Sequence, residues 1–192
     1  MKILLINPPW TYPKKYFKHS DLSVSIPLGL AYLAGMIEKN FNKNQVQIKI
    51  LDSFTLKNNI VHETSSQFHL GARFNQLSKE IEKFKPDIIG ITSPFTSQVN
   101  NAIKVIKLAK NLFPNVPVIM GGPHGTIQPM ELLNDGVDIC VIGEAENTFL
   151  EIIKRYKSKK PLDKIPGTAY LNKITPKKEF IKNLDNIPLP AY

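Results

Sequence analysis

Glycine and polar residues stand directly after several apolar runs in this sequence, and they are the residues that could do chemistry. The clearest runs are 118–120, which ends at Gly121 and Gly122, and 137–142, which ends at Gly143. Such runs are typical of buried parallel strands, and α/β sheets bind their ligands at the carboxyl ends of these strands. Glycine there lets a ligand approach backbone amides that are free to donate. We therefore expect a site for a large, polar, cofactor-like molecule.

The candidate binding residues follow four of the predicted strands. They are Asn7, Pro8, Pro9, Thr92, Ser93, Gly121, Gly122, His124, Gly143 and Glu144. His124 has two open interpretations, because its imidazole could meet a metal or a cofactor edge, or could cap the following turn. Glu146 already suits the start of a helix by its charge, so Glu144 is the better ligand candidate. The glycines could also serve only to turn the chain. No residue is predicted to be catalytic, and no protein ligand for a metal is assigned.

Several common chemistries are disfavoured by the motifs. The first strand is not followed by Gly-x-Gly-x-x-Gly, and there is no phosphate-binding Gly-Lys-Ser/Thr loop, which argues against dinucleotides and nucleoside triphosphates. Ser93 is followed by Pro94 rather than placed in a Gly-x-Ser-x-Gly elbow, which argues against a hydrolase. Cys140 is the only cysteine, so the chain can form neither an internal disulfide nor a thiolate cluster for zinc or iron–sulfur.

Five strands alternating with helices must position these residues. The strands are expected at 2–6, 46–51, 87–92, 116–120 and 137–142, and the helices at 27–40, 74–84, 97–113, 129–134 and 144–156. This alternation implies right-handed crossovers and an α/β fold whose parallel sheet has helices on both faces. The aromatic segment 10–25 is interpreted as a loop, either a lid over a ligand or an ordinary packed loop. The polar segment 57–71 is also interpreted as a loop.

The chain changes character after residue 157. We expect one domain at 1–157, then a basic β arm and linker at 158–192, with strand-like runs at 168–171 and 179–181. Much of the net charge of +9 lies here, because 154–182 holds ten Lys and Arg residues against two acidic ones. Without interleaved aromatic residues, this segment does not favour nucleic acid. No apolar run suits a membrane span or a signal peptide, so we expect a cytoplasmic protein.

In its ordered set of motifs, the sequence resembles the cobalamin-binding domain that precedes the core of cobalamin-dependent radical S-adenosylmethionine enzymes. The matching segments are 5–9, 27–34, 86–93, 121–124, 137–138, 143–149 and 184–190. The resemblance implies a Rossmann-like, flavodoxin-type sheet of five parallel strands, with cobalamin across its carboxyl edge. Thr92 and Ser93 would line the pocket for the nucleotide tail, and Gly121, Gly122 and Gly143 would leave room for it.

The resemblance also implies what this chain lacks. Many cobalamin modules carry Asp-x-His-x-x-Gly, whose histidine ligates cobalt, but this sequence has 7–10, Asn-Pro-Pro-Trp, at that position. The radical core needs Cys-x-x-x-Cys-x-x-Cys, so the iron–sulfur cluster and S-adenosylmethionine would belong to a radical domain in cis or in trans. We therefore expect a cobalamin-binding module of a methyl-transferring enzyme, not catalytic alone. The alternatives are a scaffold or partner-binding domain that has lost the cofactor and, less favoured, a flavin binder.

Overall fold

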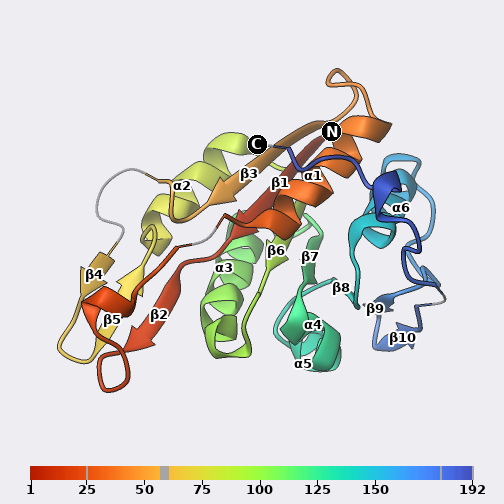
Figure 1. The fold of residues 1–192 in the computed structure, drawn as a ribbon. Coiled ribbons are helices and arrows are strands. Elements are labelled where there is room, and N and C mark those ends of the chain that lie inside the picture. Colours follow the sequence, from red (N-terminus) through yellow and green to blue (C-terminus); the bar gives the residue numbers. More distant parts are fainter. Residues whose placement is uncertain (25, 57–60, 178, 192) are drawn as a thin grey trace.

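The structure is a computed structural model that describes residues 1–24, 26–56, 61–177 and 179–191. Its main sheet contains all five predicted parallel strands (Figure 1). They are β1 (Lys2–Asn7), β3 (Gln47–Asp52), β6 (Ile88–Thr92), β7 (Val118–Gly121) and β8 (Ile139–Val141). Their spatial order is β3-β1-β6-β7-β8. In chain order this is 2-1-3-4-5, the flavodoxin order, so the predicted fold class is confirmed.

The main sheet has seven strands rather than the predicted five, and it is not entirely parallel. The additional strands β9 (Thr168–Tyr170) and β10 (Lys173–Thr175) form a hairpin that pairs antiparallel with β8. Its two-residue turn places both Leu171 and Asn172 at positive φ, which is the geometry of a tight hairpin. The predicted second arm strand at 179–181 is wrong, because this short turn brings 173–175 back first. The division at residue 157 stays a prediction.

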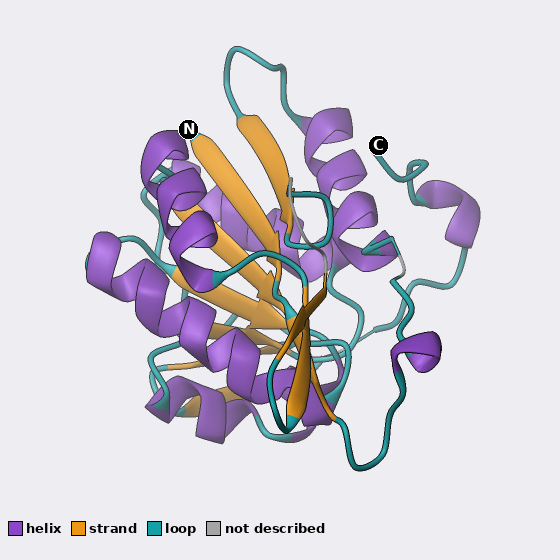
Figure 2. Cartoon of the chain, turned by 90° about the vertical axis from the view of Figure 1, so that its left-hand side faces the viewer, coloured by secondary structure: helices purple, strands orange, loops and turns teal. Residues whose placement is uncertain are grey.

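Helices cover both faces of the sheet, as predicted (Figure 2). One face carries α1 (Leu28–Asn40) and α6 (Glu146–Lys157), packed over Ile3, Leu5 and Ile119. The other face carries α2 (Phe74–Phe84), α3 (Val99–Leu112), α4 (Pro123–Ile127) and α5 (Pro129–Asn134). Leu4 and Ile6 point to that second face, since successive side chains of a strand alternate between faces. Within the described residues, every helix is too short or too polar to cross a membrane.

A small second sheet stands at the carboxyl edge of the first, in segments that we expected to be loops. It consists of β2 (Trp10–Pro13), β5 (Gln67–Leu70) and β4 (Val61–Glu63), all antiparallel. Trp10, Phe54, Phe68 and Leu70 form its core, and the Trp10 and Phe54 rings lie 5.1 Å apart. Short 3-10 turns occupy His19–Asp21, Thr96–Gln98 and Leu184–Asn186. The aromatic segment is therefore at least in part packed structure.

The small sheet should weaken in acid, because two histidines face each other across it. His62 and His69 are register partners, and their rings lie 6.0 Å apart. Burial is the main cause that lowers the pKa of each below 6.5, and the nearby Arg73 adds to it for His62. The unfolded chain therefore binds protons at these histidines more readily than the folded chain does. The free energy of unfolding is highest above about pH 6.5 and decreases as the pH falls below that value.

Urea unfolding at about pH 7.5 and about pH 5.5 checks this expectation. The variant His69→Gln keeps a polar side chain that does not titrate in this pH range. Its free energy of unfolding should therefore fall less than that of the wild type between the two pH values. An equal loss in both proteins would contradict the assignment to this pair.

Candidate functional site

A pocket of about 210 Å³ opens at the carboxyl edge of the main sheet, between the strands and helices α1 and α6. The strands contribute Leu5, Gly90 and Val141 to its inner wall, and the α6 residue Phe149 contributes to its side. The wall is therefore largely apolar. Its polar side chains are Thr92 at the end of β6, Glu144 in the turn after β8 and Glu146 at the start of α6. Such a cavity suits a flat or apolar ring whose polar groups point outward.

Topology explains why the cavity lies here. The crossover after β1 leads through α1 to β3 on one side, whereas the crossover after β6 leads through α3 to β7 on the other. The connecting helices diverge at this switch point, and open α/β sheets bind ligands in the crevice that results. Gly90 deepens the crevice, because a Cβ there would stand only 2.7 Å from Leu5 Cδ2.

Five of the ten predicted site residues line this pocket: Thr92, Gly121, Gly122, Gly143 and Glu144. The other five are not among its lining residues: Asn7, Pro8, Pro9, Ser93 and His124. The buried Asn7 amide donates to Asp52 Oδ1 at 3.0 Å, and the Ser93 hydroxyl donates to the Phe95 carbonyl at 3.2 Å. The first bond joins the ends of β1 and β3, and the second lies within the turn after β6. A ligand role for each of the ten residues stays a prediction.

The two adjacent glycines at the end of β7 have different roles. Gly122 has φ +104°, and a Cβ there would lie 2.7 Å from the Ser93 carbonyl oxygen, so the turn itself requires glycine. At Gly121 a Cβ would meet only Val141 Cβ, at 3.8 Å, which is ordinary contact. Gly121 is therefore the position where a side chain could enter the pocket without straining the backbone.

The turn after β8 forms the outer rim of the pocket. Gly143 has φ +72°, and its amide donates to Thr126 Oγ1 at 3.0 Å. The Glu144 carboxylate accepts from the Ile181 amide at 2.9 Å, and the Glu144 carbonyl accepts from the Lys177 ammonium. Part of the rim is thus made by the C-terminal segment of the chain.

Sequence reasoning missed several lining residues, above all Gly29, Leu33, Gly90 and Glu146. Gly90 carried a signal, since glycine inside an apolar strand often marks a close approach. Glu146 was assigned to the helix dipole alone. Its Oε2 is buried with no hydrogen-bond partner among the described residues, which leaves an acceptor for a hydroxyl or amide of a ligand.

His124 and Cys140 are buried away from this lining. His124 is 4% exposed, and its Nδ1 lies 3.4 Å from Thr96 Oγ1. Burial raises the pKa of the Cys140 thiol to about 12, so it stays protonated at neutral pH. In the part of the chain that the structure describes, no three His, Cys, Asp or Glu side chains are grouped to hold a metal ion.

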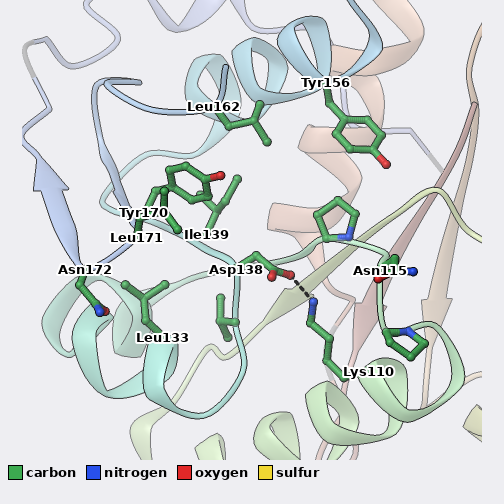
Figure 3. A pocket seen from close by; sticks show the side chains of 13 residues that line it. Lys110, Asn115, Leu133, Asp138, Ile139, Tyr156, Leu162, Tyr170, Leu171 and Asn172 are labelled. Carbon is green, nitrogen blue, oxygen red and sulfur yellow. Dashed lines mark hydrogen bonds and ion pairs between the residues drawn. The ribbon is translucent and has the colours of Figure 1, made fainter. Parts of the chain in front are cut away.

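A larger cavity, of about 520 Å³, lies at the opposite edge of the sheet (Figure 3). Its central polar groups are already paired. Asp138 Oδ2 accepts from Lys110 Nζ at 2.5 Å and from the Val118 amide at 2.6 Å, and Lys110 also donates to the Val116 carbonyl. These bonds fasten the amino ends of β7 and β8. The cavity at the carboxyl edge is therefore the better candidate for a cofactor.

A flavodoxin-order sheet with a pocket at its switch point defines a Rossmann-like ligand-binding domain. Comparison with known proteins identifies which kind. The B12 binding domain family matches residues 19–153. An uncharacterized methyltransferase of Pyrococcus horikoshii is 35% identical over 198 residues, covering 100% of this chain and 38% of the relative. The cytidylyl-2-hydroxyethylphosphonate methyltransferase of Streptomyces wedmorensis is 29% identical, covering 100% of this chain and 40% of the relative.

Among solved structures, the radical S-adenosylmethionine methyltransferase TsrM of Kitasatospora setae, with cobalamin and a 4Fe-4S cluster bound, has the same fold. The TM-score is 0.65 at 17% identity, over 100% of this chain and 31% of TsrM. The chain belongs to the B12-binding domain family. It spans about two fifths of the length of the two curated relatives.

The burial of His124 leads to a prediction that separates its two interpretations. Because its imidazole is enclosed and faces Thr96, we expect His124→Ala to lower the free energy of unfolding by about 1–3 kcal/mol. The absorption spectrum of a corrinoid bound to the variant should match that of the wild-type complex. Urea unfolding and ultraviolet–visible spectroscopy check both parts. A shifted spectrum at unchanged stability would instead place the imidazole at the cofactor.

Proposed function

We propose that this chain binds cobalamin at the switch-point pocket and serves as the cofactor module of a radical S-adenosylmethionine enzyme that transfers a methyl group. The observation that carries the proposal is the pocket itself, whose inner wall lacks side chains at Gly90 and Gly121. Family membership and the TsrM fold support it. The chain alone is not expected to be catalytic.

The residues present fit such a ligand. The apolar wall of Leu5, Val141 and Phe149 suits the aromatic base of the nucleotide tail, and a pocket of about 210 Å³ holds one such group rather than the whole cofactor. Glu146 Oε2, which has no hydrogen-bond partner among the described residues, and the Thr92 hydroxyl offer polar contacts in the lining. The corrin would then lie outside, over the turns that include Gly122 and Gly143.

The described residues bind and orient, and they exclude water from the buried base. When bound, cobalamin supplies a cobalt centre for methyl transfer. Leu30 and Leu33 of α1 close the pocket on one side, and Phe149 of α6 contributes to the opposite wall. A ring held by rigid secondary structure on several sides loses its freedom to tilt, which fixes where the rest of the cofactor lies.

The remaining machinery is assigned to other parts of the complete enzyme. We propose that a radical S-adenosylmethionine domain, in cis or in trans, holds the iron–sulfur cluster and S-adenosylmethionine. The greater length of the relatives and the cluster in TsrM support this division. A reducing, cytoplasmic location belongs to the same proposal, since the single cysteine is buried as a free thiol.

A titration with hydroxocobalamin tests the proposed function. After desalting, the purified chain should retain the corrinoid with a shifted ultraviolet–visible spectrum. Flavin mononucleotide, tried in parallel, should wash away. Loss of both ligands would favour a scaffold or partner-binding role, and retention of the flavin alone would favour a flavodoxin-like protein.

Gly121→Val tests the location of the site. The added side chain enters the pocket beside Val141 at ordinary contact distance, so the fold should persist while corrinoid affinity falls about tenfold or more. Gly125→Ala is the control, because its Cβ would also meet only ordinary contacts, and Gly125 does not line the pocket. Equal affinities of the two variants would move the site elsewhere. Gly122 is unsuitable for this test, since any side chain there strains the turn.

A further inference from the structure

The described residues of the C-terminal segment, 176–177 and 179–191, run along the outside of the pocket, and we call them the strap. It passes from the turn after β8 to helix α1, and in Figure 1 it is the dark blue trace beside α6 and α1. Its first anchor is Glu144, through the contacts with Lys177 and Ile181. Its far end is bonded to α1, where the Ala191 amide donates to the Ala31 carbonyl at 3.0 Å.

The strap is loosely packed between these anchors. Phe180, Leu184 and Leu189 are 68%, 69% and 87% exposed. A cavity of about 530 Å³ lies beneath it, lined by strap residues together with Tyr32 and Glu146. Few buried apolar contacts hold the segment down, so its polar anchors must carry much of its attachment.

The cavity beneath the strap adjoins the switch-point pocket. Glu146 lines both cavities, and Glu144 lines the pocket while it bonds the strap. The strap therefore stands where a ligand enters or leaves the pocket on this side. We propose that the strap is a gate to the pocket and that Glu144 is the positioning residue that latches it. The part of this that concerns cobalamin rests on the proposed function.

Two chemical features support the latch. The bond from the Ile181 amide to the Glu144 carboxylate is charge-assisted, and such bonds are stronger than neutral ones. The Lys177 ammonium donates to the Glu144 carbonyl at the rim, and its burial there lowers the pKa of Lys177, an effect that the nearby Glu144 and Glu146 partly offset. Both contacts end on one residue, and removing its side chain breaks the one to Ile181.

Limited trypsin digestion without any cofactor tests the latch directly. Lys182 is exposed in the strap, and its cleavage should follow the population of the open strap. We expect Glu144→Ala to raise the cleavage rate about tenfold. Glu144→Gln keeps an acceptor oxygen and should restore most of the protection. Glu179→Ala removes an exposed carboxylate of the same segment and should match the wild type. Equal rates in Glu144→Ala and the wild type would overturn the latch.

A second variant loosens the other end without touching Glu144. A Cβ at Gly35 would collide with the Leu189 carbonyl oxygen, and the nearest atoms it meets all belong to the strap. Gly35→Ala should therefore also speed cleavage at Lys182. Gly29→Ala is the matched control for helix propensity, because its Cβ meets nothing within 4 Å. If Gly35→Ala and Gly29→Ala are cleaved alike, the strap is not docked on α1 in solution.

The gate itself is tested by the dissociation rate of hydroxocobalamin in stopped-flow displacement. Glu144→Ala and Gly35→Ala should both release the corrinoid several-fold faster than the wild type, and Glu144→Gln should lie between. Faster cleavage with unchanged dissociation would overturn the gate while leaving the latch. Failure of all proteins to bind cobalamin would count against the proposed function, while the digestion results would still decide the latch.

Discussion

The whole arrangement depends on one topological constraint, the reversal of direction at the centre of the sheet. From β1 the chain crosses to β3, and from β6 it crosses the other way to β7, each by a right-handed connection. The helices that follow β1 and β6 must then lie on opposite faces, which leaves the carboxyl ends of these two strands uncovered. Leu5 and Gly90 meet there as register partners, so this part of the inner wall is set by strand pairing.

The same constraint explains how much of the fold could be predicted from the sequence. Buried parallel strands need continuous apolar runs, and the segments around Leu5, Ile89 and Val118 show them clearly. The small second sheet lacks such a signal, because its strands are short and partly exposed, and β2 pairs with a strand far away in the sequence. The hairpin of β9 and β10 was misplaced for a related reason. Its turn uses Leu171 at positive φ, a residue that rarely marks such turns.

The sequence predicts where the candidate site lies better than it predicts what each of its residues does. Turns at the carboxyl edge could be found from glycine after apolar runs, which led to Gly121 and Gly143. The partners of polar side chains could not be found in this way, because they depend on distant segments. Asn7 is bonded to Asp52 and Glu144 is bonded to the strap, although both were chosen for ligand contact. Glu146 shows the reverse case, since its role as an acceptor is indicated only by its burial without a partner in the part of the chain that the structure describes.

The glycines at the edge divide into two kinds, and this division bears on how the site can respond to its ligand. Gly122 and Gly143 have positive φ, so they hold the turns in one shape and resist substitution for backbone reasons. Gly90 and Gly121 lie within strands, and their lack of a side chain leaves room for the pocket. The inner wall is therefore built from paired strands and from turns of fixed backbone shape. The strap is loosely packed on the outer side of the pocket. Opening the strap therefore costs less free energy than moving the sheet, so we expect movement coupled to ligand binding to occur in the strap.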